Sequence, residues 1–161
     1  MSNKENTLNS NEIRVLIDTS FLLPTLRIDT DKEILEAIKY FKAIKVFYLE
    51  ISLMEAMWSV IKKVPSEKMD LINDGILAIR ETYNLISPPA SAYISAWKMY
   101  KSVHKDFIDN LLYATSRELK LLLLTVDRAL IDKLAKNKYP TDNIIEPAEL
   151  AKILKFRNKN I

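Results

Sequence analysis

IRVLID (residues 13–18) and LLLLTVD (residues 121–127) are the two stretches that decide the fold. Each is mostly a short apolar run rather than an alternation of apolar and polar residues, which is typical of strands buried on both faces of a sheet. Such strands are parallel, and helical crossovers connect them. The two stretches therefore predict an α/β fold around a central parallel sheet.

The rest of the chain alternates between strands and helices. Apolar residues at helical spacing predict a helix over residues 31–44. The further predicted strands are 46–49, 84–87 and 144–145, and the further helices are 52–63, 66–83, 90–103, 107–119, one from Arg128 and one from Pro147. This order implies right-handed crossovers and about five parallel strands, with helices on both faces of the sheet.

Length and composition indicate one intracellular domain. A chain of 161 residues can bury a sizeable core. Residues 1–11 are polar and are predicted to form a flexible tail, which leaves 12–161 as the domain. No apolar stretch reaches the roughly 20 residues that span a bilayer, and the first residues lack the apolar core of a secretory signal. We therefore expect a cytoplasmic protein without membrane contact.

The residue types exclude several kinds of site. The chain has no cysteine and one histidine, so thiolate and multi-imidazole metal sites are excluded. A metal here would be bound by oxygen, which indicates Mg²⁺ or Mn²⁺. A single glycine excludes glycine-rich phosphate loops. The net charge of +3 permits contact with a polyanion without requiring it.

Two aspartates follow predicted strands. Asp18 closes IRVLID and Asp127 closes LLLLTVD. In open parallel sheets, ligands bind outside the carboxyl ends of the strands, where both residues are expected. Each aspartate also precedes helical sequence, so N-capping is the better explanation for either one taken alone.

Glu55 is a third candidate. It is the only acid within ISLMEAMWSVIKK (residues 51–63), a segment that is apolar on nearly all sides and is therefore predicted to be buried. A buried carboxylate takes up a proton or binds a cation. The alternatives are a partner arginine or backbone group for Glu55, and Glu50 as the functional acid.

Asp109 is the fourth candidate, within FIDNLLYATSREL (residues 107–119). Asp106 lies one helical turn earlier, so the two carboxylates share a face. We assign stabilisation of the helix N-terminus first to Asp106 and metal binding first to Asp109. Four clustered acids repel one another unless a cation neutralises them. A bound divalent ion also activates water, so the pattern predicts phosphodiester hydrolysis by in-line attack.

Four segments, in order, resemble the motifs of PIN-domain ribonucleases. They are VLIDTSFLLPTL with Asp18, ISLMEAMWSVIKK with Glu55, FIDNLLYATSREL with Asp109 and LLLLTVDRAL with Asp127. The resemblance runs from about residue 13 to residue 147. It implies a three-layer α/β/α sandwich and a metal-dependent endoribonuclease that cuts RNA. Many small members of the family are VapC-like toxins held inactive by an antitoxin, and they usually form homodimers.

The resemblance also implies roles for single residues. The four acids would bind Mg²⁺ or Mn²⁺, or hold the attacking water. The predicted substrate contacts are hydroxyl groups at the rim from Thr19 and Thr125, and a phosphate contact from Asn110. The chain departs from the family at residues 117–120 (RELK), where many relatives carry a glycine, and this puts the geometry of that turn in doubt.

Other side chains have both a functional and an ordinary explanation. Arg128 is the best phosphate-binding candidate, ahead of Lys101, Lys105 and Arg117, although charged residues are usually only solvated. His104, near a helix junction, is expected to be structural. Tyr93, Trp97 and Tyr100 recur on one helix face, for which core packing or a homodimer contact is a simpler explanation than base stacking.

Two other functions remain open from the sequence. A catalytically silent PIN-like scaffold would bind RNA or protein without metal, and metal titration would distinguish it from the nuclease. A phosphoryl-transfer or receiver-type domain also places an aspartate at a strand end. It fits poorly, because Asp18 is followed by Thr19 and Ser20 rather than by a second aspartate.

Overall fold

The fold is described by a computed structural model of residues 12–159, so the predicted tail at 1–11 lies outside the described residues. Its five strands are all parallel, in the order β3-β2-β1-β4-β5. They are β1 (Arg14–Ile17), β2 (Lys45–Leu49), β3 (Asn84–Ile86), β4 (Leu122–Leu124) and β5 (Ile144–Ile145). The predicted central parallel sheet of five strands is confirmed.

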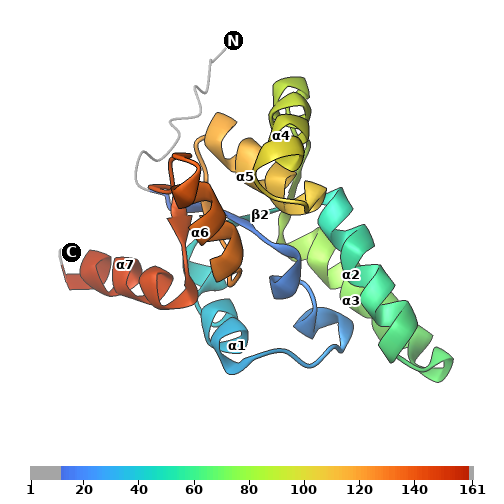
Figure 1. Cartoon of the computed structure of the whole chain (residues 1–161). Coiled ribbons are helices and arrows are strands. Elements are labelled where there is room, and N and C mark those ends of the chain that lie inside the picture. The colour runs from blue at the N-terminus through green and yellow to red at the C-terminus, as the bar shows by residue number, and fades with distance from the viewer. Residues whose placement is uncertain (1–11, 160–161) are drawn as a thin grey trace, which may run out of the picture.

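Helices cover both faces of the sheet (Figure 1). Within residues 12–159 they are α1 (Lys32–Ile38), α2 (Glu50–Lys63), α3 (Met69–Thr82), α4 (Ala90–Ser102), α5 (Phe107–Glu118), α6 (Arg128–Lys136) and α7 (Pro147–Lys159). None of these helices is long and apolar enough to cross a bilayer.

Successive strand residues supply two separate cores. Val15 and Ile17 pack in one core with α1, α2, α3 and α7. Leu16, between them in sequence, packs in the other core with α4, α5 and α6. Because neighbouring side chains of a strand point to opposite faces, a run that is apolar throughout needs a helical layer on each side. The three-layer α/β/α sandwich is therefore confirmed.

The predicted helix over residues 31–44 is wrong in its second half. Helix α1 ends at Ile38, and a short 3-10 helix, Phe41–Ala43, follows it. The break lets Phe41 pack in the core, with ring centroids 6.0 Å from Phe21 and 5.8 Å from Tyr83. Aromatic contacts across the core thus override the local helical spacing.

Helix α2 is not buried all round, contrary to expectation. Its buried side consists of Ser52, Leu53, Ala56 and Val60. Met54, Trp58 and Ile61 lie on the other side and are each at least 60% exposed. An apolar sequence does not show which sides have neighbours, and α2 has them on one side only.

The turn after α5 forms without the glycine that many relatives carry. Lys120 adopts a left-handed backbone with φ of 54°. The Leu121 N–H donates to the Ser116 carbonyl at 2.9 Å and the Lys120 N–H to the Arg117 carbonyl at 3.3 Å, which is a Schellman motif. The departure at residues 117–120 therefore leaves the turn intact, with a lysine in a conformation that glycine adopts more easily.

The strand order turns back at β1, and we call the space outside the carboxyl ends of β1 and β4 the crevice. From the central β1 the chain moves to β2 and β3 on one side, whereas β4 and β5 lie on the other. Ligand sites of open α/β sheets lie at such a switch point, outside the carboxyl ends of the strands. Asp18 follows β1 directly and Asp127 comes three residues after β4, so both lie at this end.

Candidate metal centre

Asp18 and Asp127 both cap helices. The Asp18 Oδ1 atom accepts from the Ser20 N–H at 2.8 Å and caps the 3-10 helix Thr19–Phe21. The Asp127 Oδ1 atom accepts from the Leu130 N–H at 3.0 Å and caps α6. N-capping is therefore confirmed for both residues. N-capping orients each side chain and is compatible with a site at the strand ends, because the capped turn fixes the carboxylate there.

Asp106 caps α5, as assigned. Its Oδ1 atom accepts from the backbone N–H groups of Ile108 at 3.0 Å and Asp109 at 3.1 Å. Asp109 sits in the first turn of the same helix, and its side chain is 24% exposed. The cap thus leaves Asp109 free to face the crevice.

Asp109 and Asp127 offer oxygen atoms within 4.8 Å of one another, and further acids act on Asp109 through their charge. Burial raises the pKa of Asp109 to about 8, assisted by repulsion from Asp106, Asp127, Asp18 and Glu55. Coulomb repulsion of this kind requires charges that are close and poorly solvated. The acids come from the end of β1, from α2, from the start of α5 and from the start of α6, so the fold gathers groups that are distant in sequence.

Asp18 is the most deeply buried of these acids. Burial raises its pKa, while hydrogen bonds with the Thr125 hydroxyl and the backbone of Ser20 and Val126 act in the opposite direction. Thr125 is itself buried rather than at a rim. Its Oγ1 atom also accepts from the Asp127 N–H at 3.0 Å, so the hydroxyl joins the two strand-end aspartates.

Glu55 is half-buried and has a partner in the crevice. The Thr19 hydroxyl donates to its Oε2 atom, which ties α2 to the turn after β1. Glu50, the alternative acid, pairs with Arg80 at 2.6 Å in an exposed ion pair. Since Glu50 is engaged there, the structure favours Glu55 as the acid of this helix.

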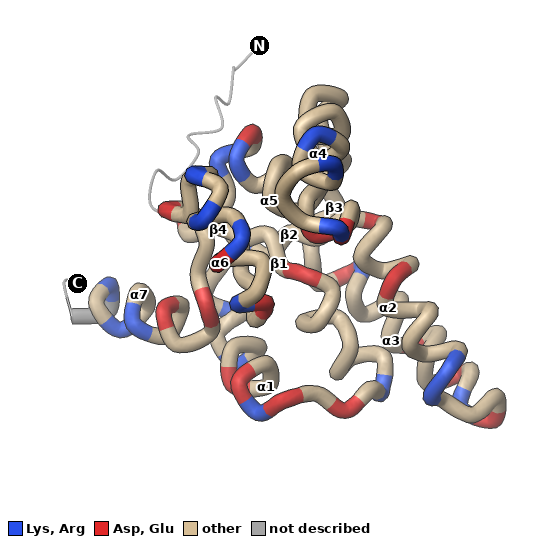
Figure 2. Tube along the Cα trace, viewed as in Figure 1, with Lys and Arg blue, Asp and Glu red and all other residues tan. Residues whose placement is uncertain are grey.

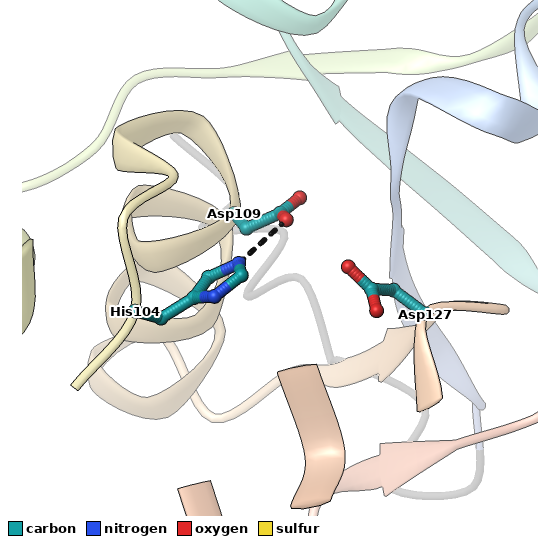
Figure 3. Close-up of side chains that lie close together, drawn as sticks. All are labelled: His104, Asp109 and Asp127. Atoms are coloured by element: carbon teal, nitrogen blue, oxygen red, sulfur yellow. Dashed lines mark hydrogen bonds and ion pairs between the residues drawn. The ribbon is translucent and has the colours of Figure 1, made fainter. Parts of the chain in front are cut away.

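His104 belongs to the same site, contrary to the expectation of a purely structural role. Among the residues that the structure describes, His104, Asp109 and Asp127 offer ligand atoms that all lie within 4.8 Å of one another. Figure 3 shows the Asp127 carboxylate facing the His104–Asp109 pair. The available sequence signal was its position two residues before the capping Asp106, which places it beside the N-terminus of α5.

Three predicted phosphate contacts are buried, already paired or distant along a helix. Asn110 is 0% exposed, and its Nδ2 atom donates to the His104 carbonyl at 2.8 Å, so it cannot reach a substrate. Arg128 is exposed but pairs with Glu146 at 2.8 Å. Arg117 lies eight residues after Asp109 along α5, roughly 12 Å away at about 1.5 Å per residue.

The donor set fits a hard divalent cation. Carboxylate oxygens are the ligands that Mg²⁺ and Mn²⁺ prefer. A cation would also offset the burial and the repulsion that together raise the pKa of Asp109. Figure 2 shows acidic positions where β1 ends and where α5 begins, and basic positions along α4 and α6. The arrangement suits an anionic substrate held next to a metal.

Comparison with known proteins gives a family. Residues 15–137 match the family model described as PIN domain. Among curated proteins, no sequence matches the chain significantly.

Solved structures give a shared fold. A toxin–antitoxin complex from Klebsiella pneumoniae matches with 17% identity and a TM-score of 0.59, over 83% of this chain and 97% of the other. A Pyrobaculum aerophilum protein matches with 16% identity and a TM-score of 0.61, over 87% and 96%. Mycobacterium tuberculosis VapC20, a sarcin–ricin loop cleaving toxin, matches with 17% identity and a TM-score of 0.57, over 73% and 93%.

Proposed function

The chain belongs to the PIN-domain family, whose members are generally nucleases, and from this premise we propose that it is a divalent-metal-dependent endoribonuclease. The proposal is supported by Asp109 and Asp127, which offer oxygen atoms that lie with a His104 nitrogen within 4.8 Å of one another, and by the charges of Asp18, Glu55 and Asp106, which add to burial in raising the pKa of Asp109. A fold without a ligand at this end gains nothing from burying several carboxylates together, since each like charge destabilises the others.

Each acid has a defined part in the proposed site. Asp18, Glu55, Asp109 and Asp127 would hold Mg²⁺ or Mn²⁺, and Asp106 fixes the start of α5 beneath Asp109. When bound, the ion would lower the pKa of a water molecule and stabilise negative charge on a phosphodiester oxygen. Thr19 holds the Glu55 carboxylate, and Thr125 holds Asp18 and Asp127, so these hydroxyls position acids rather than substrate.

RNA is the proposed substrate. Lys98, Lys101 and Lys105 are exposed on α4 and the turn that leads to Asp106. Lysines at this position suit phosphate groups, whose contacts position the strand without reading its sequence. The likeness to VapC20, a sarcin–ricin loop cleaving toxin, supports cleavage of RNA within the chain rather than from its end.

A nuclease assay with matched variants tests the proposal. Purified protein with Mn²⁺ should cut a structured RNA, and Glu55→Gln and Asp18→Asn should lose at least 100-fold in rate. Glu50→Gln is the matched control, because it removes a carboxylate from the same helix as Glu55 but outside the cluster. A DNA of the same sequence tests substrate class. Equal rates for Glu55→Gln and Glu50→Gln would refute the proposed site.

We propose further that the protein is a toxin controlled by an antitoxin. The likeness to a toxin–antitoxin complex supports this. So does an apolar groove of about 500 Å³ between α2 and α3, lined by Met57, Val60, Ile61 and Met69 among others. Expression of the wild-type chain alone should arrest growth of a bacterial host. Growth arrest that persists with Asp18→Asn would contradict a nuclease toxin.

A homodimer is the proposed assembly. Tyr93, Ile94 and Trp97 are each at least 45% exposed on one side of α4. Exposed apolar side chains that gather on one helix face favour a protein contact, and closed two-fold dimers are the commonest form. Light scattering should give a dimer for the wild type and a monomer for Trp97→Lys. A wild-type monomer at micromolar concentration would refute this assembly.

A further inference from the structure

The histidine beside Asp109 is held from several sides. His104 is 8% exposed and lies in the turn between α4 and α5. Its backbone N–H donates to the Met99 carbonyl at 3.1 Å, and its carbonyl accepts from the Asn110 amide at 2.8 Å. The backbone of His104 is therefore fixed by contacts that do not depend on its ring.

Both ring nitrogens have partners of opposite kinds. The Nδ1 atom lies 3.1 Å from the Lys133 Nζ atom, and the Nε2 atom lies 3.1 Å from the Asp109 Oδ2 atom. A lysine ammonium only donates, so Nδ1 must accept. The proton of a neutral imidazole is then on Nε2, from which it donates to Asp109. Lys133 thereby selects the tautomer that can hold the carboxylate.

Neither nitrogen is free to bind a cation in this arrangement. The Nδ1 lone pair accepts from Lys133, and Nε2 carries the proton that reaches Asp109. His104 lies close enough to Asp109 and Asp127 to be mistaken for a ligand. Its hydrogen bonds instead indicate a residue that does not bind the metal and orients a residue that does. Such residues commonly contribute 10–100-fold to metal affinity.

We propose that His104 is a positioning residue, which Lys133 fixes in one tautomer so that it orients the Asp109 carboxylate for a divalent cation. The inference rests on the proposed function for the cation. Its first part, the tautomer, stands on the contacts of the protein alone. With Oδ2 held by His104, the Oδ1 atom is the Asp109 oxygen left for a cation.

The single histidine makes the tautomer directly measurable. Nitrogen-15 NMR of the metal-free protein at about pH 9, where Asp109 is ionised, should show one imidazole with a protonated Nε2 and a bare Nδ1. Lys133→Met should convert this signal into a mixture of tautomers, whereas Lys136→Met, an exposed lysine of the same helix, should leave it unchanged. A proton on Nδ1 in the wild type would overturn the proposal, whatever the protein does with metal or RNA.

Manganese titration tests the second part. His104→Leu should weaken Mn²⁺ binding by about 10–100-fold. His104→Gln keeps a donor at the corresponding atom and should stay within about threefold of the wild type. Lys133→Met should also weaken binding relative to Lys136→Met, which is diagnostic because loss of a nearby positive charge alone would tighten it.

The outcomes separate the two hypotheses. If the wild type binds Mn²⁺ and His104→Leu binds it equally well, the positioning role is wrong and the nuclease proposal stands. If His104→Gln loses as much affinity as His104→Leu, His104 is a ligand and the proposal is overturned. If the wild type binds no Mn²⁺, the proposed function fails, and the positioning role with it. If His104→Leu does not fold, the comparison of Lys133→Met with Lys136→Met decides whether His104 positions Asp109, because both lysines are exposed.

Discussion

Replacing Asp109 with asparagine should stabilise the protein without metal and remove its response to metal. Asparagine has nearly the size of a protonated aspartic acid and cannot ionise. In the metal-free fold, the pKa of Asp109 is raised from 3.8 to about 8 by burial and by neighbouring acids. Asp109→Asn therefore keeps the shape of the favoured form and avoids the cost of its charge.

The sign and size of the effect follow from linkage. The folded state keeps a proton that the unfolded state releases above about pH 4, so wild-type stability should fall as pH rises toward 8. At about 1.4 kcal/mol per pKa unit, the upper bound is roughly 6 kcal/mol. The Asp109 side chain is 24% exposed, and water reaching it screens the charge. We expect about 1–3 kcal/mol between pH 5 and pH 8.

Urea denaturation followed by circular dichroism measures this directly. With EDTA, the free energy of unfolding of Asp109→Asn should rise relative to that of the wild type from pH 5 to pH 8. Asp132→Asn, which changes an exposed acid of α6, should keep the same free energy of unfolding as the wild type at each pH. With Mn²⁺ at 100 times its Kd, the wild type should gain about 2.7 kcal/mol, and Asp109→Asn far less. If the free energies of unfolding of the wild type and Asp109→Asn in EDTA change with pH in parallel, the reasoning is refuted.

Three further changes have expected outcomes. Gly75→Ala should lower the free energy of unfolding by roughly 1–3 kcal/mol, although alanine has the better helix propensity. The reason is that a Cβ atom would lie 2.5 Å from the Thr25 carbonyl oxygen. An unchanged melting temperature would contradict this. Lys120→Gly should raise the free energy of unfolding by about 0.5–1 kcal/mol, because glycine adopts the left-handed backbone without strain. A lower free energy of unfolding would show that the φ of 54° at Lys120 carries no strain. Thr19→Val should slow RNA cleavage about 10–100-fold with little change in stability, because Glu55 loses its hydrogen bond; an unchanged rate would remove Thr19 from the site.

Much of the fold could be predicted because burial on both sheet faces leaves a continuous apolar signal. The runs at residues 13–18 and 121–127 are strands for this reason, and the alternation with helices gave the parallel sheet. The length of α1 could not be predicted, since Phe41 leaves the helix to meet Phe21 and Tyr83, which are distant in sequence. The exposed side of α2 could not be predicted either, because apolarity does not show where neighbours are.

The site divides along a similar line. The acids were recognisable as candidates because strand ends and an isolated acid in an apolar helix mark them in sequence, and the structure places Asp109 and Asp127 within reach of one cation. The roles of the other polar side chains near the acids were not predictable. Asn110 is buried against the turn of His104, and Arg128 pairs with Glu146, because side-chain partners are set by packing between elements. His104 was missed for the same reason, since its partner Lys133 lies 29 residues away.

The most direct test of the central claim is a crystal soaked in Mn²⁺ and measured at the manganese absorption edge. The account predicts one or two anomalous peaks within about 2.5 Å of carboxylate oxygens of Asp109 and Asp127, with Asp18 or Glu55 completing the shell directly or through water. A crevice that shows no peak at saturating Mn²⁺, with the acids in the positions described, would contradict a metal-dependent nuclease.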